Sequence, residues 1–533
     1  MPTSDFDRHC REIAKRFLLT AVVVDDQRYF PTPPPTGRPP RTPTRGDVAR
    51  PRALEETRGR QRQDIDAPAL TDSFAKHGMV CGVVAPGASA TEGAPYRSAL
   101  ARADILVLDW KLHDNNDKLA LELVTGILSG DRGDRLRLIA VYTGEPGLLE
   151  IREQIVSGLE ALGRPVESSE ANCEIASGPC RIVMYAKAGT PTPGLKDRTV
   201  DEDALPDRLI DDFTRMVTGL VPSLVLTSLT TVRENVYRVL ERFDAKLDPA
   251  FLAHRACLAV PAESEQHMVE QIGSELHGIM DDAVLEARKR FSAAVEYWLT
   301  EKSEEGPYTF GDREVSLSDS KNIFNKGLGE GRGGLGASYY DKLSAGVAMD
   351  GSNGQESDMC LASKMCFRTV LERGTRTLRM GTVVRRRDAN AGEGTNLVCV
   401  TPRCDCVRVK EESPFLFLPL VRAQSGMFQL VLPPLGDGMP YEPVAVGPKT
   451  TRWVRANFNP ETETNSGTIK ASTIEADGDA RIERFVFKDV RDNLYDWVGE
   501  LKPEFAQRVA QVAAARLSDV ALNKSEWLRR KEQ

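Results

Sequence analysis

The sequence predicts a multi-domain chain with an N-terminal α/β domain on a five-stranded parallel sheet, an α-helical middle and a C-terminal mainly-β module. Three patterns lead to this prediction. Short runs that are apolar on both faces recur over the first 190 residues, and such runs are typical of buried parallel strands. Apolar residues then follow a helical spacing up to residue 302. From Gly392 onward, short alternating runs separated by turns indicate β-strands.

Length and composition fit a globular protein of several domains. The chain has 533 residues, of which 41% are hydrophobic and 28% charged, and its net charge is -8. This mildly acidic balance gives no electrostatic signal for nucleic acid. No apolar run approaches the roughly 20 residues that span a bilayer, and the N-terminus lacks the apolar core of a signal peptide. We therefore expect no membrane association. Because the 10 cysteines are scattered along the chain, we also expect reduced thiols and a cytoplasmic location.

Polar side chains stand at the point where four of the predicted strands end. In chain order they are a pair of acids, one acid, a hydroxyl and a lysine: Asp25 and Asp26, Asp109, Thr143, and Lys187. A single Asp after a strand is usually a helix cap or a turn residue, but five such residues in this order favour a shared site. In open parallel sheets, ligands bind at the edge formed by the carboxyl ends of the strands.

This order of residues resembles the receiver domain of two-component response regulators, which has a flavodoxin-like fold. The resemblance implies that Asp109 accepts a phosphoryl group from a sensor histidine kinase. It also implies a role for Lys187, which would pair with the transferred group, and for Thr143, which would hydrogen-bond to it and move when the domain switches.

The resemblance further implies a bound Mg²⁺. Its ligands would be Asp25, Asp26, Asp109 and the backbone carbonyl of Lys111. A hard divalent cation prefers oxygen ligands, and its charge would offset the repulsion between the attacking carboxylate and the phosphoryl group.

The N-terminal domain also departs from common receivers. Residues 30–66 are rich in Pro and Arg and poor in apolar side chains, so we interpret them as an inserted flexible loop, with a binding arm as the alternative. Ala188 follows the lysine where a proline is usual. Tyr185 stands one position closer to the lysine than the aromatic residue that is often coupled to the switch.

The predicted domains divide the chain as follows: the receiver-like domain over 1–220, a helical region over 221–302, a Gly-rich loop with a connecting helix over 303–390, a β module over 391–490, and C-terminal helices over 491–533. We expect the β module to be a small barrel or sandwich. The terminal helices would pack on it or form a homodimer.

The helical region carries His254 within the segment DPAFLAHR. An ordinary helix histidine is favoured there over a phosphotransfer histidine. A similar segment follows the receiver in atypical receiver proteins of bacterial conflict and phage-defence gene clusters, and this resemblance implies a role in antiviral defence.

A second candidate site lies in the β module, where Cys399, Cys404, Asp405 and Cys406 are close in sequence. Three thiolates could bind Zn²⁺, but their spacing matches no zinc knuckle and no histidine is near. A nucleophilic cysteine would need a histidine base, and all six histidines precede this module. Structural packing is therefore favoured over a metal site, and a metal site over catalysis.

The sequence thus predicts a phosphoacceptor signalling protein that controls a C-terminal output or interaction module. We expect no enzymatic activity beyond the receiver's own autophosphorylation and autodephosphorylation. Two alternatives remain. The receiver could be a non-switching scaffold or phosphate sink that docks a kinase, or the chain could be an effector whose cysteine-containing β module binds metal or nucleic acid.

Overall fold

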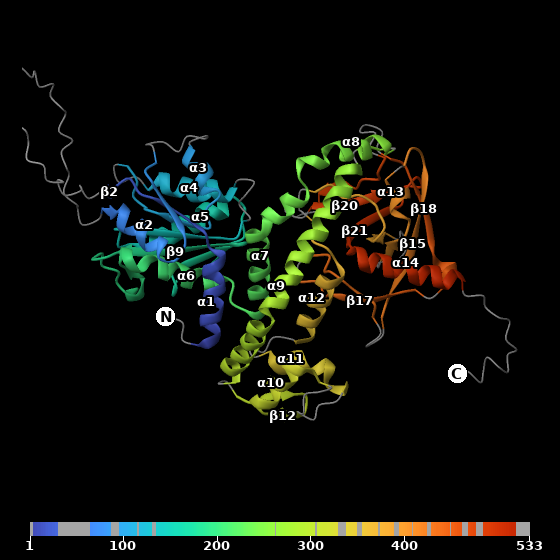
Figure 1. Cartoon of the computed structure of the whole chain (residues 1–533). Coiled ribbons are helices and arrows are strands. Elements are labelled where there is room, and N and C mark those ends of the chain that lie inside the picture. The colour runs from blue at the N-terminus through green and yellow to red at the C-terminus, as the bar shows by residue number, and fades with distance from the viewer. Residues whose placement is uncertain are drawn as a thin grey trace, which may run out of the picture. The chain divides into compact units, whose positions relative to one another are not determined.

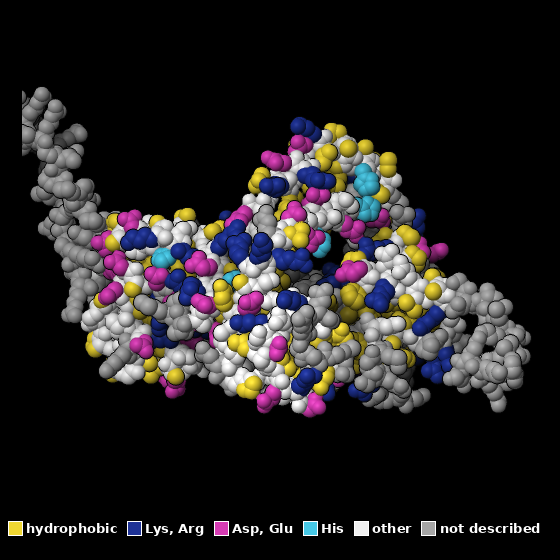
Figure 2. Space-filling view, turned by 60° about the horizontal axis from the view of Figure 1, so that its bottom comes forward, with side chains coloured by type: hydrophobic (Ala, Val, Ile, Leu, Met, Phe, Trp, Pro, Cys, Tyr) yellow, Lys and Arg dark blue, Asp and Glu magenta, His cyan; other side chains and the backbone are white. Residues whose placement is uncertain are grey.

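The protein forms two compact units (Figure 1), Met1–Ala245 with Val269–Glu304 and Lys246–Met268 with Glu305–Gln533. The computed structural model describes residues 4–29, 64–86, 95–113, 117–129, 135–258, 260–261, 263–303, 306–328, 337–348, 354–370, 374–387, 394–407, 409–423, 428–436, 438–447, 449–460, 467–475 and 483–518. Figure 2 shows positive and negative side chains over the surface of the first unit, as the modest net charge of -8 leads one to expect.

The first unit is built on a sheet of eight strands. Its centre has the five predicted parallel strands in the order β4-β1-β5-β6-β9, with bounds Val80–Val84, Thr20–Val24, Ile105–Leu108, Arg137–Thr143 and Cys180–Lys187. Nearly all residues of β1, β5, β6 and β9 are buried, which is why these strands appear in the sequence as continuous apolar runs.

Three further strands extend this sheet beyond the predicted five. β7 (Glu167–Ser169) and β8 (Glu174–Ser177) form an antiparallel hairpin whose second strand pairs with β9, and β10 (Thr199–Val200) pairs with β9 in parallel. The hairpin lies within residues 163–179, outside the strands that the sequence predicts. Its strands are too short and too polar to show a clear period of two.

Helices cover both faces of this sheet. α3 (Pro95–Leu100), α4 (Lys118–Ser129) and α5 (Leu148–Ala161) pack on one face. On the other face lie α1 (Asp5–Phe17), α2 (Ala67–Ala75) and α6 (Leu205–Met216). Each face therefore has its own apolar core, and together they hold the carboxyl ends of the central strands in a fixed register.

The Pro/Arg-rich segment is framed by two short strands that pair in parallel, β2 (Arg28–Tyr29) and β3 (Ile65–Asp66). The expected insertion itself, residues 30–63, lies outside the described residues. Asp66 ends β3 and caps α2, since its side chain accepts a hydrogen bond from the amide of Ala69.

The predicted helical region is present as α7 (Leu220–Arg242), α8 (Asp248–Cys257) and α9 (Glu263–Ser303). Gly219 joins α6 to α7 at a φ of 146°, where a Cβ would stand 3.0 Å from the Pro222 ring, so only glycine suits this turn. Among the described helices, none is by itself long and apolar enough to cross a membrane. One pair, Glu202–Met216 with Leu220–Cys257, meets the length and composition when taken together, but it is bent by 115°.

The second unit contains more structure before its main sheet than the sequence indicated. The region expected to be a Gly-rich loop with one helix forms a hairpin and several helices: β11 (Tyr308–Phe310), β12 (Arg313–Val315), α10 (Leu317–Lys326), the 3-10 helix η4 (Ala337–Lys342), α11 (Leu343–Val347) and α12 (Gly354–Cys366). Much of the Gly-rich run, residues 329–336, lies outside the described residues.

A nine-stranded sheet forms the core of the second unit. Its order is β16-β17-β15-β14-β13-β21-β20-β19, with β18 paired to β15. In chain order β13 to β21 span Thr382–Arg386, Thr395–Cys399, Ser413–Arg422, Leu430–Leu432, Glu442–Val446, Val454–Phe458, Ser472–Glu475, Glu483–Lys488 and Leu494–Glu500. The single turn α13 (Arg403–Cys406) follows β14. Among the described strands, β15 pairs with β14, β17 and β18, so the sheet branches there, and no ladder joins β16 to β19.

The strands of the second unit extend beyond both ends of the expected β module, residues 391–490. Strand β13 begins at Thr382, and Leu494–Glu500 is strand β21 rather than the start of the terminal helices. β21 lies between β13 and β20 and pairs with both. The terminal helix α14 spans Pro503–Ser518 and packs on one face of the sheet, as expected.

The turn between β20 and β21 is built around the buried carboxylate of Asp489. One oxygen accepts from the amides of Arg491 at 2.8 Å and Asn493 at 2.9 Å. The other accepts from Asn493 Nδ2 at 2.8 Å and from the Tyr495 hydroxyl at 3.0 Å. Burial alone would raise the pKa of Asp489, but these hydrogen bonds outweigh burial and hold that pKa below its ordinary value.

We predict that Asp489→Asn destabilises this hairpin by about 1–3 kcal/mol, because the new amide group would face two donors. Hydrogen exchange of the β20 and β21 amides should accelerate. Since the folded pKa is lowered, the carboxylate stabilises the fold above its ordinary pKa, and this contribution is lost as the pH falls through the lowered value. The difference in hairpin stability between the wild type and Asp489→Asn should therefore shrink in acid.

The matched control is Asp492→Asn, in the same turn at a φ of 64°, where asparagine is also tolerated. Asp492 is exposed, and its carboxylate pairs with Lys488 at the surface, so exchange should barely change. Equal effects of the two variants would contradict the role given to Asp489.

Candidate functional site

The predicted site residues meet at one edge of the parallel sheet. Strand register pairs Val24 with Leu108, Leu108 with Val141, and Thr143 with Ala186. Asp25 and Asp109 follow their strands directly, while Thr143 and Lys187 are the last residues of theirs. The edge lies beside β1, where the strand order reverses, and ligands bind at such a point in open α/β sheets.

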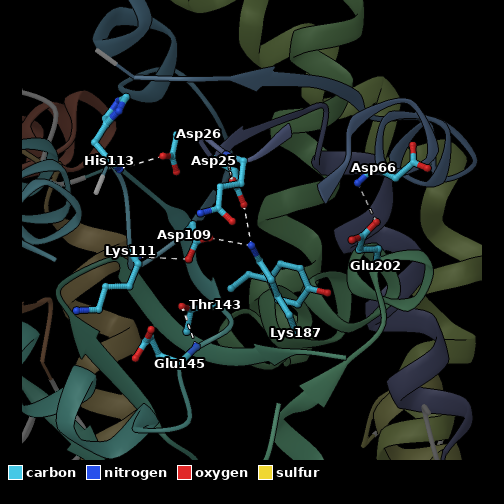
Figure 3. A network of polar contacts seen from close by, with 12 residues as sticks. Asp25, Asp26, Asp66, Asp109, Lys111, His113, Thr143, Glu145, Lys187 and Glu202 are labelled. Atoms are coloured by element: carbon cyan, nitrogen blue, oxygen red, sulfur yellow. Dashed lines mark hydrogen bonds and ion pairs between the residues drawn. The ribbon is translucent and has the colours of Figure 1, made fainter. Parts of the chain in front are cut away.

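The ammonium group of Lys187 lies between two carboxylates (Figure 3). Its Nζ donates to Asp25 Oδ2 at 2.8 Å and to Asp109 Oδ2 at 2.7 Å. All three residues are buried, with exposed fractions of 4%, 0% and 6% for Lys187, Asp25 and Asp109. The same ammonium lies 5.9 Å from the centre of the Tyr142 ring, which adds a cation–π contact. Lys187 thus holds together the ends of three strands.

The charges at this edge do not balance. Burial raises the pKa of Asp25 to about 7, although Lys187 opposes the rise, and the Asp109 carboxylate contributes to it. Burial by itself would lower the pKa of Lys187, but Asp109 and Asp25 outweigh it and raise that pKa. Lys187 is therefore charged, and among the described side chains it is the one cation that pairs with the carboxyl groups at this edge, those of Asp25 and Asp109.

Asp26 is held from the loop that follows Asp109. Its Oδ2 accepts from the His113 amide at 3.0 Å, whereas its Oδ1 is buried with no hydrogen-bond partner among the described residues. The His113 backbone has a φ of 40°, and its ring Nε2 lies 2.5 Å from the Pro86 carbonyl oxygen. No sequence pattern marks His113, because its contact with Asp26 is made by the main chain.

Neighbouring amides and hydroxyls fix the remaining groups. Asp25 Oδ1 accepts from the Gln27 amide at 2.7 Å, and Asp109 Oδ1 faces the Lys111 amide at 3.4 Å. The Lys111 ammonium is engaged elsewhere, 3.7 Å from Asp117. The fully buried Thr143 hydroxyl accepts from the Glu145 amide at 3.3 Å. The predicted residues of the receiver site therefore lie at this edge, at the carboxyl ends of β1, β5, β6 and β9 or in the loops that follow them.

The donor set suits a hard cation, although the side chains are not arranged around one. Carboxylate oxygens are the ligands that Mg²⁺ prefers, and the partnerless Asp26 Oδ1 offers one. Across the described residues, however, no group of three or more His, Cys, Asp or Glu side chains could hold a metal ion. Lys187 Nζ takes one oxygen each from Asp25 and Asp109, so a cation would have to share these two carboxylates with the lysine.

Tyr185 lies on the face of the sheet that α6 covers. Its hydroxyl donates to Asp212 Oδ2 at 2.5 Å and accepts from Arg208 Nε at 3.0 Å, and the Arg198 guanidinium lies 5.2 Å from its ring centre. Both Tyr185 and Asp212 are fully buried. This aromatic side chain is thereby fixed on α6, in keeping with its unusual position in the sequence.

Of the four candidate residues of the β module, Cys399 and Cys406 lie together in the core, whereas Cys404 and Asp405 are exposed. Cys399 and Cys406 are buried, and Cys406 Sγ donates to the Thr401 carbonyl at 3.5 Å. Hydrogen bonding to Cys399, followed by burial, raises the pKa of Cys406. Cys404 is exposed, and its Sγ donates to Asp405 Oδ1 at 3.4 Å. The four residues do not converge on a metal position within the part of the chain that is described.

Comparison with known proteins identifies the region that contains the strand-end acids. Residues 17–192 match the family model described as the response receiver domain. No curated protein and no solved structure gives a significant match. The matched range includes Asp25, Asp26, Asp109, Thr143 and Lys187, together with the whole parallel sheet edge. Receiver domains generally bind Mg²⁺, interact with histidine kinases and serve as phosphoacceptors in signalling. Residues 17–192 of this chain are a response receiver domain.

Proposed function

We propose that this protein takes a phosphoryl group on Asp109 from a sensor histidine kinase, as the phosphoacceptor of a two-component phosphorelay. The observation that carries the proposal is the position of the Asp109 carboxylate, which directly follows β5 and lies 2.7 Å from Lys187. The neighbouring acids Asp25 and Asp26 stand at the end of the adjacent strand.

In the proposed reaction, an Asp109 oxygen attacks the phosphorus of a phosphohistidine. An O–P bond forms while the P–N bond breaks, and the leaving imidazole nitrogen takes up a proton from water. Lys187, already beside Asp109, would pair with a phosphoryl oxygen, and the Thr143 hydroxyl would donate to another. Asp25, Asp26, Asp109 and the Lys111 carbonyl would hold Mg²⁺. The bound ion would supply positive charge against the developing negative charge on the phosphoryl group.

We further propose that phosphorylation controls the second unit as an output or interaction module. One observation favours the alternative, a receiver that docks a kinase without switching. Tyr185 is fixed to Asp212 and Arg208 by hydrogen bonds inside a buried network, so its side chain is not free to follow Thr143. The site chemistry is the same in both cases, and the two differ in what happens after phosphorylation.

The first prediction concerns the phosphoacceptor. Incubation with Mg²⁺ and acetyl phosphate should add the mass of one phosphoryl group in intact mass spectrometry, and Asp109→Asn should abolish the adduct. Chelation of Mg²⁺ before the incubation should also prevent it.

A matched control for Asp109 is Asp117→Asn, since Asp117 is a partly exposed partner of Lys111 outside the acid cluster. This variant should keep the adduct. Two results would sink the proposal: an adduct that persists in Asp109→Asn, or a wild type that neither forms the adduct nor binds beryllofluoride.

The second prediction concerns the buried lysine. Lys187→Met should destabilise the receiver by about 3–5 kcal/mol without metal, because two buried carboxylates lose their shared cation. Added Mg²⁺ should restore more stability in this variant than in the wild type, as binding to the folded state stabilises it. Hydrogen exchange of the β1, β5 and β9 amides would measure both effects.

Lys111→Met removes a partly exposed lysine close to the same site and should change the exchange little. If Mg²⁺ protects wild type and Lys187→Met equally, the acids do not depend on a shared cation in the way proposed.

The third prediction separates a switch from a scaffold. Beryllofluoride, bound at Asp109, should alter hydrogen exchange in the nine-stranded sheet of the second unit if the receiver controls it. Under the scaffold alternative, the changes stay within the loops after β1, β5, β6 and β9. Asp109→Asn with beryllofluoride serves as the baseline.

A further inference from the structure

A separate cavity of about 240 Å³ lies in the first unit between α1, α7 and α9. In Figure 1 these three helices lie next to one another, and Ser4, the cap of α1, donates to Glu301 of α9 at 2.6 Å. The cavity is smaller than the roughly 300–1,000 Å³ of pockets for drug-sized ligands. None of its lining residues comes from the sheet edge that carries Asp109. It is therefore a second site, suited by its size to a small molecule.

Thr230 lines this cavity, and its hydroxyl has no hydrogen-bond partner among the described residues. Thr230 is only 4% exposed, and its Oγ1 is buried. Neighbouring hydroxyls on α7 behave differently, because each donates to the carbonyl four residues earlier: Thr227 to Ser223, Ser228 to Leu224, and Thr231 to Thr227. A buried hydroxyl without a partner is costly and rare in folded proteins. Thr230 thus holds an unused hydrogen-bond donor next to the cavity.

The remaining lining residues define the character of that occupant. Ile13, Leu224 and Phe291 supply half-buried apolar walls, and the buried Ala287 lies beside them. These side chains suit a compact apolar body.

Charged side chains are also among the lining residues: Glu12, Arg16 and Arg290. Arg290 is exposed and makes no ion pair or hydrogen bond with the described residues, whereas Arg16 is already paired with Glu234 through two hydrogen bonds. Burial, followed by the charge of Arg290, lowers the pKa of His9, so His9 adds no positive charge at neutral pH. Glu12 is the one acidic residue among those that line the cavity. The guanidinium of Arg290 is thus the group left to bind an anion.

We propose that this cavity binds a small carboxylate with an apolar body, which pairs with Arg290 and accepts a hydrogen bond from Thr230. The site is distinct from the phosphoacceptor site, so its occupancy does not rest on the proposed function. Asp109→Asn should bind the same ligand with unchanged affinity.

Phenylacetate and its neutral, shape-matched amide phenylacetamide are suitable probes, with binding to the full chain measured by titration calorimetry. We expect phenylacetate to bind the wild type more tightly than phenylacetamide. Thr230→Val should weaken phenylacetate about threefold to tenfold by removing one hydrogen-bond donor at nearly constant volume. Arg290→Gln should weaken it about twofold to fivefold, as for an exposed ion pair, and leave phenylacetamide unchanged. Glu12→Gln should tighten phenylacetate, because it removes the like charge from the lining.

Two controls lie on the same helices but outside the cavity lining. Thr231→Val removes a hydroxyl that is already bonded within α7, and Arg288→Gln removes an exposed cation of α9. Neither should change the affinity for phenylacetate. Ala287→Phe should fill the cavity and abolish binding of both probes, and if that variant does not fold, the nearly isosteric Thr230→Val still tests the site.

Three results would overturn the proposal. One is a wild type that does not bind phenylacetate, and another is equal affinity for phenylacetate and phenylacetamide. The third is binding that remains unchanged in both Thr230→Val and Arg290→Gln.

Discussion

The shared ammonium of Lys187 is the interaction on which the receiver site depends. Two buried carboxylates, at the ends of β1 and β5, cannot both be ionised without a cation within hydrogen-bond reach. Lys187 reaches both only because β1, β5, β6 and β9 run in parallel and end at the same level. The apolar cores on the two sheet faces therefore do more than stabilise the fold, since they hold three charged groups in register. A shift of one residue in any of these ladders would turn a strand-end side chain to the other face.

The same arrangement leaves the site with more acid than base. Asp26, with an oxygen that has no partner, adds a third carboxyl group to the pair that Lys187 bridges. Burial raises the pKa of Asp25 because a single lysine does not fully stabilise its charged form. Among the described side chains, this imbalance is costly for folding. Under the proposed function, the acidic site would attract a divalent cation, which an attacking carboxylate needs beside a phosphoryl group. The excess of carboxyl groups over cations thus supports the proposed function.

The central strands and the strand-end residues were predictable from sequence because both leave strong local signals. A parallel strand buried on both faces is a continuous apolar run, and a polar residue directly after it marks the sheet edge. The parts that were missed have weaker signals. Strand β21 carries Asp496 and Glu500 within its run and is followed at once by a helix, so its alternation was read as helical. The β7–β8 hairpin is short and polar. His113 acts through its amide, and a main-chain donor has no signature in side-chain type.

The chain passes between the two units more than once. It leaves the first unit after α7, enters the second for α8 and the start of α9, and returns within α9 at Val269 before leaving again. One uninterrupted helix, Glu263–Ser303, therefore belongs to both units. The same helix supplies Ala287, Arg290 and Phe291 to the cavity beside α1, and α1 leads directly into β1 and its terminal acids. Along the chain, the acid edge is connected to the second unit by α6 and α7, which follow β9 and precede α8, so any covalent coupling between them passes through these two helices.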